Sequence, residues 1–212
     1  MKLTFIIMLL FAGTVLTAPA WGLDVNAPQS VAAETILSYD KHERYWYLSG
    51  PNSLDIQYTA ELLPMHELLY NACLYNYSID GELAPQQKAW DLSILITVRC
   101  YQRTPVKKAS LSLKYAWSAG TLLSFKGGLG PSGQNEDEKG RSFLYQVFTL
   151  RLPFETFLLW EKEGQGQIKL NHNHHARSSG IIVTVHGNYI DSIWSGLQKQ
   201  LPYHKKQGSG PG

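Results

Sequence analysis

Apolar and polar residues alternate with a period of two along several stretches of this chain. The clearest case is residues 91–101, where Leu92, Ile94 and Ile96 share one side of an extended segment and the other side is mostly polar. Such alternation is typical of β-strands that place one face on a core. Further segments of this kind, separated by turn signals, predict strands over residues 35–39, 45–48, 54–62, 110–119, 142–152, 156–161, 167–175 and 180–187.

Strands spaced in this way, without helices between them, predict a mostly β fold: an antiparallel β-sandwich or jelly-roll-like single domain over residues 21–203. Residues 64–77 fit a helix or a strand equally well. One short C-terminal helix is expected over residues 192–201, with Asp191 or Ser192 as its cap. Residues 126–141 are rich in glycine and charge, which predicts a polar hairpin loop.

The first residues have the pattern of a secretory signal peptide. Lys2 is followed by an apolar run to Leu16, and Ala18-Pro19-Ala20 resembles a cleavage site. Residues 1–20 are therefore expected to be removed on export, which predicts a periplasmic or secreted protein. No later segment is apolar and long enough to predict a transmembrane helix. Residues 204–212 are predicted to be a disordered tail.

The two cysteines, Cys73 and Cys100, follow the signal segment. In an oxidising compartment they are expected to form one disulfide, although two buried thiols are the alternative. The formal net charge of +2 and the lack of a lysine and arginine stripe argue against nucleic-acid binding. No catalytic motif is complete, since no Gly-x-Ser-x-Gly segment occurs and the His66 motif lacks its second histidine.

Residues 171–180, with the sequence NHNHHARSSG, hold the strongest candidate for metal chemistry. On a strand, His172 and His174 point the same way, and imidazole pairs of this kind bind zinc or another transition metal. His186 is a candidate third ligand. A metal-binding protein or metal-dependent enzyme at these histidines is one hypothesis. The alternatives are a pH-sensitive surface and a polar strand end without metal.

Aromatic residues form a second candidate site. In residues 44–50, RYWYLSG, Trp46 should face one way and Tyr45 and Tyr47 the other, and Tyr75 and Tyr77 repeat the theme. Exposed rings of this kind stack on sugars or anchor protein interfaces. Burial of the rings between two layers is the alternative. These features favour an exported binding or accessory module for a protein or glycan partner in the cell envelope, with no cofactor. An outer-membrane β-barrel is a further hypothesis.

Overall fold

The computed structural model describes residues 35–53, 61–62, 69–104, 109–175, 177 and 180–200. The predicted signal peptide, residues 1–20, and the predicted tail, residues 204–212, lie outside the described residues. The described chain is mostly β, as predicted, and its strands form two antiparallel sheets that resemble a β-sandwich.

The larger sheet has six strands, and three of them are long. Its order is β1-β2-β4-β5-β9-β8. Strands β4 (Tyr70–Leu83), β5 (Asp91–Gln102) and β9 (Ser142–Leu152) form its centre. Strands β1 (Ile36–Asp40) and β2 (Tyr45–Ser49) form a hairpin at one side, and β8 (Ser132–Glu136) is the edge strand at the other side.

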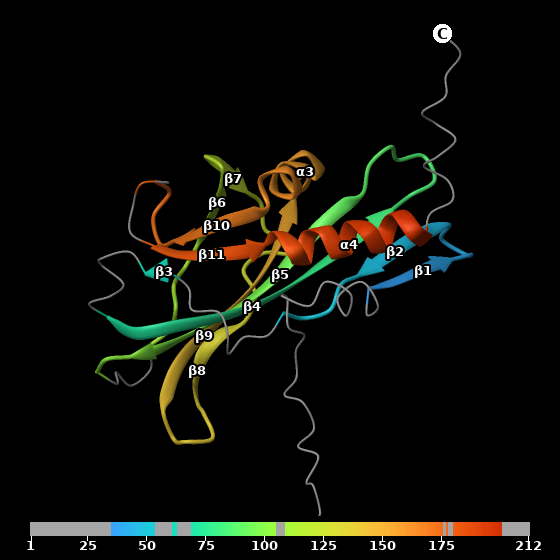
Figure 1. Cartoon of the computed structure of the whole chain (residues 1–212). Helices are drawn as coiled ribbons and strands as arrows, with labels where there is room; N and C mark the ends of the chain where they lie inside the picture. Colours follow the sequence, from blue (N-terminus) through green and yellow to red (C-terminus); the bar gives the residue numbers. More distant parts are fainter. Residues whose placement is uncertain are drawn as a thin grey trace, which may run out of the picture.

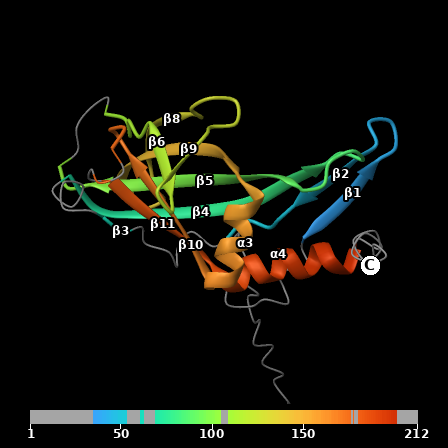
Figure 2. The ribbon, with the colours of Figure 1, turned by 90° about the horizontal axis from the view of Figure 1, so that it is seen from above.

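The smaller sheet has five strands in the order β3-β11-β10-β6-β7. Its central hairpin pairs β10 (Gln165–Asn171) with β11 (Gly180–His186). The other strands, β3 (Glu61–Leu62), β6 (Tyr115–Ser118) and β7 (Thr121–Leu123), are short. Together with the helices α3 (Phe154–Glu163) and α4 (Gly187–Gln200), this sheet covers one face of the larger sheet (Figures 1 and 2). We call that face inner and the opposite face outer.

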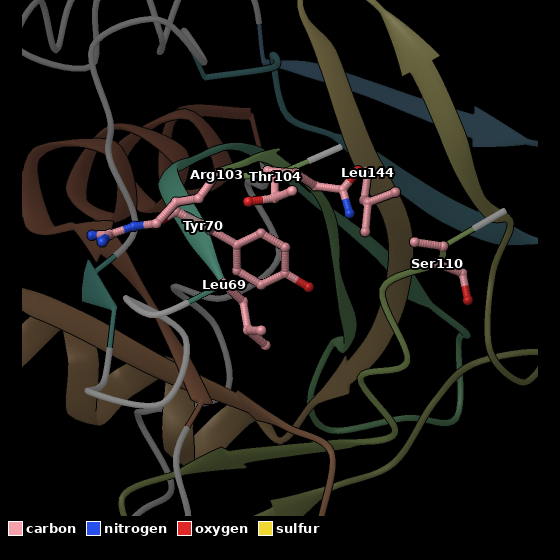
Figure 3. A pocket seen from close by; sticks show the side chains of 8 residues that line it. Leu69, Tyr70, Arg103, Thr104, Ser110 and Leu144 are labelled. Atoms are coloured by element: carbon pink, nitrogen blue, oxygen red, sulfur yellow. The ribbon is translucent and has the colours of Figure 1, made fainter. Parts of the chain in front are cut away.

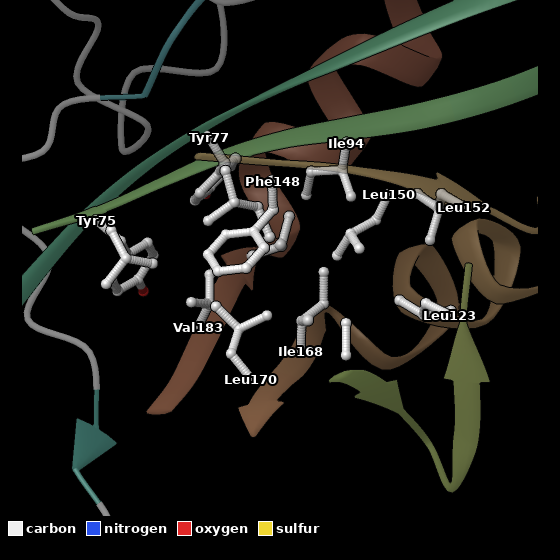
Figure 4. Close-up of a cluster of buried hydrophobic side chains, with 14 of the residues drawn as sticks. Tyr75, Tyr77, Ile94, Leu123, Phe148, Leu150, Leu152, Ile168, Leu170 and Val183 are labelled. Atoms are coloured by element: carbon white, nitrogen blue, oxygen red, sulfur yellow. The ribbon is translucent and has the colours of Figure 1, made fainter. Parts of the chain in front are cut away.

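The core lies between the inner face and this second layer. The period-two pattern produces it directly, because the alternate residues Ile94, Ile96 and Val98 of β5 all have no exposed surface. Phe148 of β9 and Val183 of β11 meet them from the two sheets (Figure 4). The disulfide predicted between Cys73 and Cys100 is present, with the two residues directly opposite each other on β4 and β5.

Helix α3 corrects the prediction of a strand over residues 156–161. Pro153 precedes its first turn, and Gly164 ends it in the left-handed conformation with φ 72°. Phe157 and Trp160 are three positions apart, so they lie on the same helix face and are both buried. Apolar residues in a short segment fit a strand or a helix, and the flanking Pro153 and Gly164 favour the helix.

The C-terminal helix and the polar segment 126–141 also differ from the predictions. Helix α4 begins at Gly187, so Asp191 and Ser192 lie inside it and do not cap it; the Ser192 hydroxyl donates to the Asn188 carbonyl oxygen at 2.7 Å. The polar segment 126–141 contains β8, because its backbone pairs with β9. Within the described residues, neither helix has the length and apolar character needed to span a membrane.

Candidate functional site

The β1–β2 hairpin, which we call the aromatic hairpin, carries partly exposed rings on both of its faces. The alternation predicted for Tyr45, Trp46 and Tyr47 is present. Trp46 packs toward the core on the inner face, where its ring centroid lies 4.9 Å from that of Tyr39. Tyr45 and Tyr47 stack on the outer face with centroids 6.3 Å apart. Tyr39 is 43% exposed, so the ring surface continues to the edge of the sheet.

Carboxylates surround the outer pair of rings. The Tyr47 hydroxyl donates to Glu43 Oε2 at 2.6 Å. This bond, with desolvation and the negative charges of Glu43, Glu82 and Asp40, raises the pKa of Tyr47 to about 12. Lys126 lies 3.1 Å from Glu82 and offsets part of the charge. The outer face of the hairpin therefore combines aromatic surface with carboxylates that act as hydrogen-bond acceptors.

Tyr75 and Tyr77 do not belong to an exposed surface, which corrects that expectation. They are 3% and 1% exposed, and their rings stack on the inner face with centroids 6.2 Å apart. The Tyr75 hydroxyl donates to the Thr184 carbonyl oxygen at 2.9 Å and accepts from the Thr184 N–H at 3.1 Å. Tyr77 Oη accepts from the His186 N–H at 3.1 Å. Both tyrosines thus satisfy backbone groups of β11 and join the two sheets (Figure 4).

The structure does not bring the three candidate metal ligands together. His186 pairs with Gln165 at one end of the β10–β11 hairpin, whereas His172 and His174 follow Asn171 at the other end. That is a separation of about 20 Å of extended strand. Within the described residues, no group of three or more histidine, cysteine, aspartate or glutamate side chains is arranged to hold a metal ion.

Each histidine has other contacts. His172 Nδ1 lies 2.9 Å from the Ser112 carbonyl oxygen. The ring of His174 stands edge-on to Tyr115 and Trp117, with centroids 5.1 and 5.7 Å away. The His186 N–H donates to Tyr77 Oη, and burial lowers the pKa of the His186 imidazole. These contacts agree with the polar-strand-end interpretation of residues 171–180.

At the opposite end of the large sheet, a hollow of about 330 Å³ opens on the inner side (Figure 3). Tyr70 and Leu144 line it, and a β-bulge between Tyr70 and Ala72 lies at its edge. Gln102 also lines the hollow, and its Oε1 is buried without a hydrogen-bond partner in the described structure. The Arg103 guanidinium is directed away from the Tyr70 ring and donates from Nε to the Tyr70 carbonyl oxygen at 3.2 Å.

A second hollow, of about 530 Å³, lies on the outer side of the same strand ends. Tyr101 lines it, with the Arg141 guanidinium 4.8 Å above its ring. The Arg141 guanidinium lies 2.7 Å from Asp137 Oδ2. Asp137 accepts hydrogen bonds from the backbone and side chain of Arg141 and from the backbone of Lys139, and these bonds lower the pKa of Asp137 to about 2. Arg141 is thus already engaged by a neighbouring carboxylate and a ring, and we do not assign a ligand to this hollow.

The chain matches no known protein family. Neither curated proteins nor solved structures give a match, so no relative supplies a function. The aromatic hairpin is the candidate site that both the sequence pattern and the geometry indicate. Sequence reasoning missed the two hollows, because Gln102, Arg103 and Arg141 carry no motif and meet only through strand pairing.

Proposed function

We propose that this protein is an exported binding module that contacts a protein or glycan partner through the aromatic hairpin. One observation carries the proposal: aromatic rings remain partly exposed on both faces of β1–β2. Tyr39 and Trp46 lie on the inner face, and Tyr45 and Tyr47 lie on the outer face.

The rings suit binding because tyrosine and tryptophan combine a large apolar surface with a polar group. Such residues dominate the binding energy of many interfaces and also stack on sugar rings. On this hairpin, the carboxylates of Glu43 and Glu82 lie beside the rings and accept hydrogen bonds from a hydroxyl, amide or ammonium group. Specificity would come from these polar neighbours, while the rings supply contact area.

The buried disulfide supports the exported location. Cys73 and Cys100 both have 0% exposure, and their bond joins two central strands of the fold. Structural disulfides of this kind form and persist in oxidising compartments such as the periplasm or the cell exterior. A binding role in the cell envelope agrees with that location.

The proposal is tested by titrating the isotope-labelled protein with two panels of probes, neutral oligosaccharides and short unstructured peptides. We expect backbone shifts to change at Tyr45–Tyr47 with at least one probe. A Tyr45→Ala/Tyr47→Ala variant should weaken that binding by about tenfold or more, since a lost aromatic anchor costs about 1–2 kcal/mol or more.

Tyr115→Ala is the matched control, because Tyr115 is also a half-buried ring but lies on the smaller sheet. The control should bind like the unchanged protein. Equal loss in both variants, or shifts confined to residues away from the hairpin, would contradict a contact through these rings.

A further inference from the structure

The two edge strands of the large sheet differ in chemistry. Strand β8 has the sequence SGQNE and offers polar side chains and a glycine at its edge. Strand β1 has the sequence ILSYD, with Ile36 64% and Tyr39 43% exposed. Proteins commonly protect edge strands with charges, prolines or bulges, because an unprotected edge pairs with another chain. Strand β8 therefore exposes polar side chains, whereas β1 exposes two large apolar side chains, Ile36 and Tyr39, beside an edge.

The register shows which backbone groups of β1 are available. The Gly50 N–H donates to the Ile79 carbonyl oxygen at 2.9 Å, so even-numbered residues of β2 direct their backbone groups to β4. Odd-numbered residues of β2 therefore bond to β1, where their partners are even-numbered. Leu37 and Tyr39 consequently direct their N–H and carbonyl groups to the outer edge, where no strand of the described residues pairs with β1.

The side chains beside this edge differ between the two faces. On the inner face, Tyr39 and Trp46 form an apolar strip. On the outer face, Asp40 and Glu43 lie beside Tyr45 and Tyr47, and Asp40 ends β1 itself. An added strand would place alternate side chains on these two faces. Its inner side chains would meet rings, and its outer side chains would meet Ile36 at one end of β1 and carboxylates and rings at the other end.

We propose that β1 binds an extended segment of a partner polypeptide as a further strand of the large sheet. The inner side chains of that segment are apolar and pack on Tyr39 and Trp46, and at least one outer side chain is a lysine or arginine beside Asp40. This inference rests on the proposed function and narrows its partner to a polypeptide. Backbone bonds give the affinity, and the alternating chemistry of the two faces gives the specificity.

The carboxylates of Asp40 and Glu43, which lie beside the outer rings, are the reason for choosing a basic segment. A cation over a tyrosine ring is attracted by the ring quadrupole, and Asp40 and Glu43 add charge attraction. A second copy of this chain fits less well, because its β1 strand, ILSYD, supplies no lysine or arginine for the outer face. An acidic segment is disfavoured because its carboxylates would lie beside Asp40.

The test uses a short acetylated peptide of alternating valine and lysine, and a control peptide of alternating valine and glutamate. We expect the lysine peptide to slow amide hydrogen exchange at Leu37 and Tyr39 and to bind at least tenfold more tightly than the glutamate peptide. Equal binding of both peptides, or binding without protection of these two amides, would overturn the inference.

Two variants at one position separate the backbone from the ring. Tyr39→Thr removes the ring and keeps the N–H, whereas Tyr39→Pro removes both; proline is tolerated where the N–H faces the edge. We expect Tyr39→Pro to bind the lysine peptide at least tenfold more weakly than Tyr39→Thr. If Tyr39→Pro does not fold, the exchange measurement on the unchanged protein still decides the question.

Further outcomes distinguish this inference from the proposed function. Binding of neutral oligosaccharides at Tyr45–Tyr47, with no binding of the lysine peptide, would keep the proposed function and refute strand addition. A concentration-dependent dimer that Tyr39→Pro abolishes would also refute it, since β1 would then be an interface between copies of this chain. Sedimentation analysis of both proteins without peptide detects that case.

Discussion

Replacing Tyr75 by phenylalanine tests how the two sheets are held together. The change keeps the ring but removes a hydroxyl that bonds to both the N–H and the carbonyl oxygen of Thr184, at 3.1 and 2.9 Å. Each buried backbone group left without a partner costs about 1–3 kcal/mol. Thr184 is half-buried, so water can reach part of its backbone. We therefore expect Tyr75→Phe to lower the free energy of unfolding by about 2–4 kcal/mol.

Urea denaturation of the oxidised protein, followed by circular dichroism, measures this loss. Tyr77→Phe should cost less, about 1–3 kcal/mol, because it leaves the His186 N–H without its bond to the hydroxyl. Tyr145→Phe is the control, since Tyr145 is half-buried on the outer face and its hydroxyl has no hydrogen bond in the described structure. A loss below about 0.5 kcal/mol for Tyr75→Phe, or one equal to the control, would refute the reasoning.

Three other measurements test separate parts of the structure. A Cys73→Ala/Cys100→Ala variant should lose about 3–4 kcal/mol of unfolding free energy, because the bond closes a loop with a sequence separation of 27; unchanged stability in denaturant would contradict this. Gly166→Ala should lower the melting temperature, since its new Cβ would clash with the ring of Trp160; an unchanged melting temperature would mean that the ring moves freely. Tyr47 should stay protonated until about pH 12 in an ultraviolet titration, and Glu43→Gln should lower the pKa of Tyr47. An equal pKa of Tyr47 in both proteins would exclude the hydrogen bond from Tyr47 to Glu43.

Period-two alternation predicted two of the three long strands well, because each buries one face and leaves the other half-exposed. It left the start of β4 open, since residues 64–77 fitted a helix or a strand equally well. Residues 91–101 and 142–152 correspond closely to β5 and β9. Alternation failed for α3, where Phe157 and Trp160 belong to a short segment that has too few residues to show its period. It also missed β8, since SGQNE lacks apolar residues and exists as a strand through pairing with β9.

The candidate site was only partly predictable for a related reason. Alternation gives the relative directions of Tyr45, Trp46 and Tyr47, but it does not tell which layer covers a strand. Tyr75 and Tyr77 show the same kind of pattern and are buried, because β11 packs over β4 at that point. The histidines were misleading because the register of β10 and β11 pairs His186 with Gln165, and the alternation pattern does not give that register.

Hydroxyl-radical footprinting of the tyrosines tests most directly the claim that the aromatic hairpin is free for binding while the tyrosines of β4 hold the sheets together. We expect rapid modification of Tyr39, slower modification of Tyr45 and Tyr47, and protection of Tyr75 and Tyr77 in the folded protein. When a partner that binds is added, the modification of the three hairpin tyrosines should slow. Rapid modification of Tyr75 and Tyr77, or hairpin tyrosines that a partner leaves equally reactive, would contradict the account.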